Sequence, residues 1–196
     1  ELKRANGNLT EGPVWDGKNI LFTDGRENRI LRFDPSTNNI SIDIEGTFGV
    51  NGLNYNSKGE LFGCEQKGRR IVRYENGKAI LVADKLYGKR LNAPNDLAID
   101  LEDNIWFSDQ ISSIDNKPDL HFSSVIKASN IGSGNYKTER MTFDCSSPNG
   151  ILFSADYKKL FVAQSDFSGN QRRQLRSYPI LDSETLGKYE ILHDFG

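Results

Sequence analysis

Four short motifs, each with an oxygen-bearing side chain, recur along the chain and could together bind a hard metal ion. They are Glu11-Gly12-Pro13-Val14, Val50-Asn51-Gly52-Leu53, Pro94-Asn95-Asp96-Leu97 and Pro148-Asn149-Gly150-Ile151. Carboxylate and amide oxygens are the ligands that calcium prefers, and it takes about 6 to 8 of them. Soft-metal chemistry is disfavoured because the two histidines, His121 and His193, lie outside the repeated positions. The motifs therefore indicate a calcium-like site.

Each motif also has a simpler interpretation when it is taken alone. A Pro-Asn-Gly or Pro-Asn-Asp sequence is typical of a turn, and Glu11 alone would be an exposed acid before a turn. The recurrence of one such residue in every unit favours a shared site. For Asn51 both alternatives stay open, namely a structural polar residue and a member of the site. Asp24 and Asp109, which end strand-like runs, are predicted to cap turns.

The elements that carry these motifs are strand-length apolar runs. Equivalent runs begin at Leu21, Leu61, Ile105 and Leu160, roughly 40 to 55 residues apart, with four strand signals per unit. Asn76-Gly77 between two alternating runs is a β-hairpin signal, and no sustained 3.6-residue period is present. This period with all-β content is typical of a β-propeller. A β-sandwich with long loops is the alternative, but it does not explain the recurring motif.

Propeller geometry gives the recurrence a spatial meaning. The innermost strand of each blade lies beside a central channel, so equivalent residues of successive blades point toward a common axis. We therefore expect Glu11, Asn51, Asn95 and Asn149 to form a ring of oxygens. Aromatic residues on the strands, among them Trp15 and Trp106, are predicted to pack between blades.

Composition excludes several classes of partner. The chain has 196 residues, 36% of them hydrophobic, with a net charge of -2 and a pI of about 5.8. Nothing here favours nucleic acid or an anionic membrane, and no apolar run is long enough for a transmembrane helix. Cys64 and Cys145 are predicted core residues, with a disulfide between them left open. Because the chain starts at Glu1, the absence of a signal peptide has no weight, and the compartment stays open between cytoplasmic and periplasmic or secreted.

Three segments in order carry a resemblance to a known family. They are Glu11-Gly12-Pro13-Val14-Trp15, then Gly88-Lys89-Arg90-Leu91-Asn92-Ala93-Pro94-Asn95-Asp96-Leu97, then Ser147-Pro148-Asn149-Gly150-Ile151. With them the whole chain resembles the gluconolactonase/regucalcin (senescence marker protein) family. The resemblance implies a six-bladed propeller with a divalent metal, often calcium, at the bottom of the central channel.

The resemblance also implies roles for individual residues. Glu11 and Asn149 match metal ligands of the family, and Asn95 matches a residue that contacts the metal or its bound substrate. Asp96 matches an acidic residue that contacts substrate. Arg90 has no match in the family's motifs, but it precedes the Asn95 motif and is expected to shape the pocket rim and bind substrate. The family's remaining ligand, an Asp in an Asp-Gly motif that usually also serves as the base, has no counterpart after Asn149. Asp96 is the nearest substitute for that base.

The resemblance further implies how the chain is divided. Residues 1–196 are expected to form one partial propeller domain, with blades at about 11–48, 49–90, 91–146 and 147–196. About four of six blades are then present. An open blade face exposes a strand edge, so the resemblance leaves two alternatives: the chain is marginally stable alone, or a partner such as a second copy covers the face.

The function implied is a metal-dependent hydrolase of sugar lactones or related esters. Water would attack a carbonyl that the divalent cation polarises. The alternative is a non-catalytic propeller that binds a metal, a ligand or a protein partner. The exact lactone is not encoded in any motif, since pocket specificity lies in loops such as 110–122 and 164–174.

Overall fold

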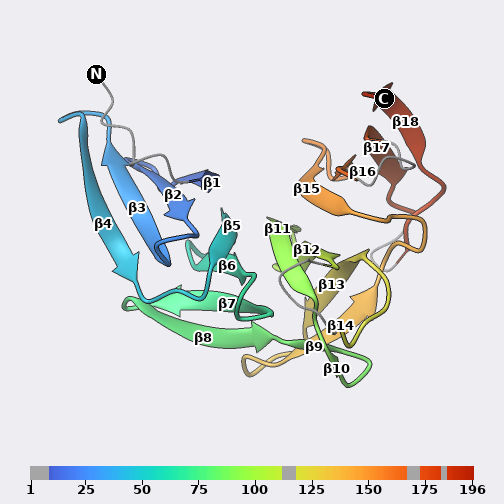
Figure 1. Cartoon of the computed structure of the whole chain (residues 1–196), viewed down its shortest axis with the longest axis horizontal. Helices are drawn as coiled ribbons and strands as arrows, with labels where there is room; N and C mark the ends of the chain where they lie inside the picture. The colour runs from blue at the N-terminus through green and yellow to red at the C-terminus, as the bar shows by residue number, and fades with distance from the viewer. Residues whose placement is uncertain (1–8, 112–117, 167–172, 182–184) are drawn as a thin grey trace.

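The computed structural model describes residues 9–111, 118–166, 173–181 and 185–196, and these residues form antiparallel sheets (Figure 1). Four sheets contain four strands each, and a small hairpin adds two more strands. Within the described ranges no residue is helical, and none forms a helix long and apolar enough to cross a bilayer. The all-β prediction is confirmed.

The strands follow the units expected from the sequence. The first sheet contains β1 (Thr10–Trp15), β2 (Ile20–Asp24), β3 (Arg29–Asp34) and β4 (Asn39–Glu45). The second contains β5 (Val50–Tyr55), β6 (Leu61–Glu65), β7 (Arg70–Glu75) and β8 (Lys78–Ala83). A hairpin of β9 (Lys85–Leu86) and β10 (Lys89–Arg90) follows.

The second half of the chain repeats this plan. The third sheet contains β11 (Ala93–Ile99), β12 (Ile105–Gln110), β13 (Ser124–Asn130) and β14 (Tyr136–Arg140). The fourth contains β15 (Pro148–Phe153), β16 (Lys159–Gln164), β17 (Gln174–Pro179) and β18 (Glu190–Asp194). In every sheet, strands adjacent in sequence are adjacent in space, which is the meander of a propeller blade.

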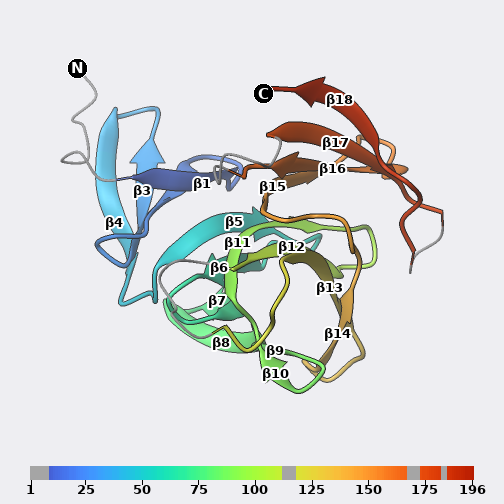
Figure 2. The ribbon, with the colours of Figure 1, turned by 45° about the vertical axis from the view of Figure 1, so that its right-hand side comes forward.

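The four sheets follow one another in an arc (Figures 1 and 2). Their first strands are neighbours, because β1 contacts β5, β5 contacts β11 and β11 contacts β15. The long-range contacts therefore join the same strand of successive sheets. A sandwich of two facing sheets is excluded by this topology.

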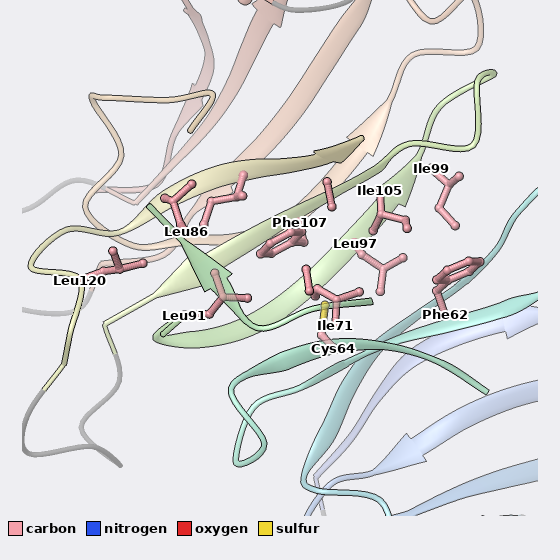
Figure 3. Packing of buried hydrophobic residues seen from close by; sticks show 13 residues of the cluster. Phe62, Cys64, Ile71, Leu86, Leu91, Leu97, Ile99, Ile105, Phe107 and Leu120 are labelled. Atoms are coloured by element: carbon pink, nitrogen blue, oxygen red, sulfur yellow. The ribbon is translucent and has the colours of Figure 1, made fainter. Parts of the chain in front are cut away.

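Apolar side chains fill the space between successive sheets. Figure 3 shows the cluster between the second and third sheets, which includes Phe62, Ile71, Leu97 and Phe107. A second cluster, between the third and fourth sheets, surrounds Trp106 and includes Ile151, Phe153 and Tyr178. A third cluster, between the first and second sheets, surrounds Leu21 and includes Ile30, Val50 and Val72. The core therefore holds neighbouring blades together.

The prediction that Trp15 packs between blades is wrong. Its side chain is 54% exposed, whereas Trp106 is 1% exposed. Val14 packs against the core between the first two sheets, and successive residues of a strand point to opposite faces. Trp15 therefore lies on the side of the first sheet that no other described sheet covers. Cys64 and Cys145 are both buried as free thiols.

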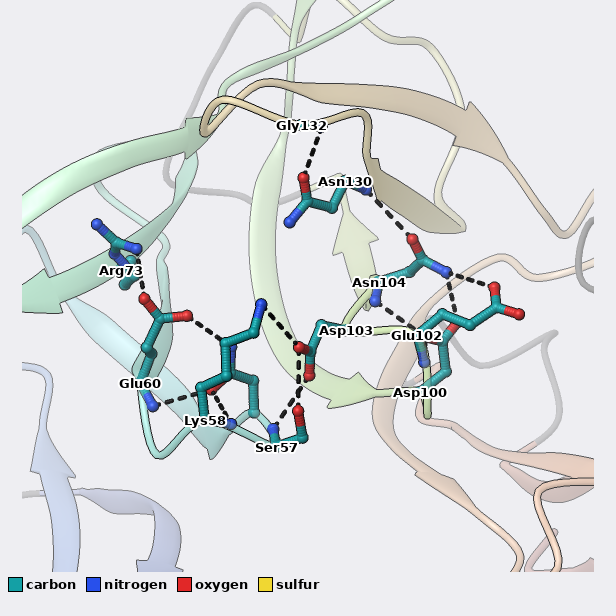
Figure 4. A network of polar contacts seen from close by, with 11 residues as sticks. Ser57, Lys58, Glu60, Arg73, Asp100, Glu102, Asp103, Asn104, Asn130 and Gly132 are labelled. Atoms are coloured by element: carbon teal, nitrogen blue, oxygen red, sulfur yellow. Dashed lines mark hydrogen bonds and ion pairs between the residues drawn. The ribbon is translucent and has the colours of Figure 1, made fainter.

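A polar network joins the second and third sheets at the ends of their first strands (Figure 4). The Asp103 carboxylate accepts hydrogen bonds from the Ser57 N–H at 3.0 Å and the Ser57 hydroxyl at 3.1 Å. Lys58 forms an ion pair with the same carboxylate at 3.3 Å. These contacts hold the two turns together, and the opposite ends of β5 and β11 carry the repeated motifs.

Candidate metal and substrate site

Each first strand has a β-bulge at its repeated motif. The residue that precedes the motif's oxygen-bearing side chain pairs with a residue at or next to the end of the second strand: Thr10 with Asp24, Val50 with Glu65, Pro94 with Asp109, and Pro148 with Gln164. The next residues, Glu11, Asn51, Asn95 and Asn149, therefore occupy equivalent positions. The register then shifts in all four strands. A bulge changes the direction of side chains and is frequent beside active sites.

The bulges of neighbouring strands lie against one another. A Cβ added to Gly12 would lie 2.3 Å from the Asn51 carbonyl oxygen, and one added to Gly52 would lie 2.5 Å from Asp96 Oδ1. The other Asp96 oxygen accepts a hydrogen bond from the Ile151 N–H at 3.0 Å. Asp96 thus spans from β5 to β15.

Glu11 and Asn51 line one pocket between the first two sheets, together with Thr23, Gln66 and Lys67. Asn95 and Asn149 contact neighbouring strands through their backbone carbonyls. The Asn95 carbonyl lies beside Gly52, and the Asn149 carbonyl accepts a hydrogen bond from the Ser108 hydroxyl. The structure thus brings the four motifs side by side.

The side chains at the four equivalent positions are available to a ligand. Among the described residues, none of Glu11, Asn51, Asn95 and Asn149 has a side-chain hydrogen bond to another described residue. Polar groups without internal partners are directed to water or to a ligand. Three amides and a carboxylate fit a hard cation, for which oxygen is the preferred donor.

Asp96 adds a second carboxylate whose electrostatics fit a nearby cation. Burial raises the pKa of Asp96, and the negative charge of Glu11 raises it further, while hydrogen bonds from the Ile151 and Leu97 N–H groups act in the opposite direction. A divalent cation between the two carboxylates would offset their repulsion.

The described residues contain no group of three or more His, Cys, Asp and Glu side chains that could hold a metal. Such a group is not needed if amides supply most of the ligands, as the motifs indicate. The donor set at the bulges is therefore compatible with calcium and poorly suited to zinc.

Arg90 lies in β10, on the hairpin that leads into β11. Its side chain is exposed, and Nη2 donates a hydrogen bond to the Gly68 carbonyl at 3.4 Å. The sequence contained no clear signal for this hairpin. The placement of Arg90 at the pocket rim remains a prediction.

Asp24, the last residue of β2, and Asp109, the last but one of β12, occupy equivalent positions but have different partners. Asp24 forms an ion pair with Arg29 at 3.0 Å and accepts the Glu27 N–H at 3.4 Å, so its turn-capping role is confirmed. Asp109 instead pairs in register with Ser124. It accepts the Asn92 N–H at 2.9 Å, so it caps the segment before β11 and not a turn after its own strand.

Asp109 is the most perturbed acid near the motifs. It is 1% exposed, and its Oδ1 has no hydrogen-bond partner within the described structure. Burial raises its pKa to about 7, against the lowering effects of the Asn92 and Ala93 N–H groups and of the Arg69 charge. Sequence reasoning missed this anchor because chain order alone does not show that Ser124 pairs with Asp109 or that the Asn92 N–H lies beside its carboxylate.

Asp109→Asn is expected to change how stability depends on pH. The pKa of Asp109 rises from 3.8 to about 7 on folding, so the folded state binds the proton more tightly. The resulting stabilisation is complete below pH 3.8 and is lost as pH rises through 7. The neutral amide removes this component, so the free energy of unfolding should fall less steeply between pH 4 and 7. Urea unfolding across that range measures it.

The control for this experiment is Asp34→Asn. Asp34 is half-buried at the end of β3, and hydrogen bonds from Ser36 lower the pKa of its carboxyl group below the usual value, so its protonation should change little in the tested window. An unchanged slope in Asp109→Asn, or an equal change in Asp34→Asn, would contradict the prediction.

Gly52→Ala is expected to disturb the bulge of β11. The new Cβ would meet Asp96 Oδ1 at 2.5 Å and the Asp96 Cα at 2.7 Å. Overpacking of this kind costs about 1–3 kcal/mol. Gly150→Ala is the matched control, because Gly150 holds the equivalent position and its nearest atom, Asp96 Oδ2, would be 3.8 Å away. Equal urea midpoints for the two variants would refute the assignment of the close contact.

Comparison with known proteins places this chain in a family. The family model described as "SMP-30/Gluconolactonase/LRE-like region" matches residues 9–195. A gluconolactonase from Zymomonas mobilis is 27% identical over 179 residues, which cover 80% of this chain and 49% of that protein. The chain therefore spans about half the length of this curated relative.

Solved structures give the same result for the fold. A gluconolactonase from Xanthomonas campestris superposes with a TM-score of 0.84 at 25% identity, covering 94% of this chain and 62% of that one. A calcium-binding regucalcin from Agrobacterium tumefaciens superposes with a TM-score of 0.68 at 18% identity, covering 93% and 58%; this second likeness shows the fold alone. The β-propeller prediction is confirmed, and the chain belongs to the SMP-30/gluconolactonase/LRE-like family.

Proposed function

We propose that this chain belongs to a metal-dependent hydrolase of sugar lactones or related esters. The observation that carries the proposal is the set of equivalent bulge positions, which present Glu11, Asn51, Asn95 and Asn149 without side-chain hydrogen bonds among the described residues. The gluconolactonase relatives support the substrate class.

Glu11, Asn95 and Asn149 are the residues that would hold the metal, and calcium is the preferred ion because all donors are oxygens. The calcium-binding relative with the same fold supports this choice. When bound, a divalent cation supplies Lewis-acid polarisation of the lactone carbonyl. With Glu11 as the single ionised ligand, the cation would keep part of its positive charge uncompensated by its ligands.

Asp96 is the proposed catalytic residue of this chain. Its carboxylate is held between β5 and β15 by the Ile151 N–H and the close approach of Gly52. A raised pKa strengthens a carboxylate as a proton acceptor, and burial is the first cause of the rise. Asp96 would accept the proton of the attacking water, while Asn95 and Arg90 would contact the substrate.

The proposed domain is a single propeller of which residues 1–196 form a part, with blades at about 11–48, 49–90, 91–146 and 147–196. Two apolar grooves support it, one on each outer sheet. The first is lined by Ile20, Phe22 and Phe33, and the second by Leu152, Phe161, Leu175 and Leu192. Further blades or a second copy would cover them. Mass spectrometry of the intact gene product distinguishes the two. Further blades would raise the mass under denaturing conditions, whereas a second copy would double the mass only under native conditions.

The test of the function is hydrolysis of aldonolactones by the complete gene product, followed in a pH-stat with calcium and after chelation. We expect acid release that depends on calcium and is lost in Asp96→Asn. No hydrolysis of any aldonolactone would reject the lactonase. Calcium binding without hydrolysis would favour the non-catalytic propeller that binds a metal or ligand.

A further inference from the structure

Ser108, on β12, connects two motifs of the candidate site through hydrogen bonds to their backbones. Its side chain is fully buried. The hydroxyl accepts a hydrogen bond from the Asp96 N–H at 3.1 Å and donates one to the Asn149 carbonyl at 2.6 Å. One hydroxyl thus connects the bulge of β11 with the bulge of β15, although the two lie in different sheets.

These hydrogen bonds reach the places where the sheet ladders are interrupted. The register shifts between Pro94 and Leu97 and again between Pro148 and Ile151. A bulge leaves its extra residue without a normal ladder partner, and an unpaired buried backbone group is costly. The Ser108 hydroxyl supplies hydrogen-bond partners for both bulges. It therefore constrains the backbone at Asp96 and Asn149, from which the two site side chains project.

The same device occurs at one other junction. Thr23 occupies the equivalent position of β2, and its Oγ1 donates to the Asn51 carbonyl of the next sheet at 2.9 Å. In β6 the equivalent residue is Cys64, and in β16 it is Ala163. The hydroxyl is therefore present at two junctions and is not a requirement of every blade.

We propose that Ser108 is a positioning residue that sets the spacing between Asp96 and Asn149 and thereby the affinity of the site for its cation. The part that concerns the cation rests on the function proposed above. Groups that orient metal ligands from behind typically contribute about 10- to 100-fold in metal affinity. The Ser108 hydroxyl is bonded to backbone groups of Asp96 and Asn149, so it acts through the backbone of the two motifs.

Calorimetric calcium titration of the complete protein tests the proposal, with Ser108→Ala, Ser108→Cys and Ser108→Thr. We expect the dissociation constant to rise about tenfold in the alanine and cysteine variants and to recover in the threonine variant, since Thr23 fills the equivalent position. Cysteine is nearly isosteric with serine, and Cys64 occupies the equivalent position of β6. The cysteine variant therefore separates the effect of losing the hydrogen bond from the effect of losing side-chain volume.

Ser124→Ala is the matched control. Ser124 is 1% exposed in the same sheet, and its hydroxyl donates to the carbonyl of Thr142 at 2.8 Å, which is not a motif residue. This variant should lose stability without a change in calcium affinity. Parent-like affinity in Ser108→Ala and Ser108→Cys, or an equal loss in Ser124→Ala, would overturn the proposal.

Amide hydrogen exchange without calcium separates this inference from the proposed function. The Asp96 and Ile151 N–H groups should exchange faster in Ser108→Ala than in Ser124→Ala. The Asp96 N–H donates to the Ser108 hydroxyl, and the Ile151 N–H donates to the Asp96 carboxylate. If the parent binds no calcium, the proposed metal site fails. Unchanged exchange at both amides would overturn the positioning role by itself.

Discussion

Replacement of Glu11 with glutamine is expected to weaken calcium binding at least about tenfold, because ligand charge is a main determinant of calcium affinity. Glu11 is the carboxylate among the four equivalent bulge positions, and the other three positions supply neutral amides. The substitution keeps the side chain's size and one carbonyl oxygen, so it removes mainly charge. Isothermal titration calorimetry of parent and variant under the same buffer measures the change.

The same substitution should also lower the pKa of Asp96, since the Glu11 charge contributes to raising it. Burial, the largest cause of the rise, is unchanged by this substitution. The control is Glu139→Gln on β14, an exposed residue on the outermost strand of its sheet. Identical calcium affinities for parent and Glu11→Gln would remove Glu11 from the ligand set.

Trp106→Ala is expected to destabilise the protein by about 3–5 kcal/mol, the usual range for removal of a large buried aromatic. The ring packs edge-on against Phe153 with centroids 5.7 Å apart. Its Nε1–H donates to Asp100 Oδ2 at 2.9 Å, and the Lys127 ammonium lies 5.4 Å from the ring centroid. The substitution would open a cavity between the third and fourth sheets.

Urea unfolding followed by circular dichroism measures this effect, with Trp15→Ala as the matched control. Trp15 is the same residue type but is 54% exposed, so its removal should change stability by no more than about 0.5 kcal/mol. Trp106→Phe keeps most of the volume and should cost about 1 kcal/mol for the lost hydrogen bond. Similar losses in the two alanine variants would contradict the assignment of Trp106 to the core.

Local sequence patterns were sufficient to predict most of the strands. Alternation of apolar and polar residues depends only on neighbours in sequence, as in β7 (Arg70–Glu75) and β8 (Lys78–Ala83), which the Asn76-Gly77 turn separates. The recurrence of the four motifs also needs no structure to be seen. The hairpin of β9 and β10, and the exposed side of β1 that carries Trp15, were not predictable in this way.

The chain's own sequence thus determined the all-β class, the four-part repeat and the residue types at the candidate site. Only the tertiary structure decided that Glu11, Asn51, Asn95 and Asn149 share one register position at a bulge. It also decided that Ser108 reaches Asn149 in the next sheet and that Asp109 pairs in register with Ser124, whereas Asp24 pairs with Arg29. The physical reason is that these contacts join residues far apart in sequence, and their geometry depends on how whole sheets pack.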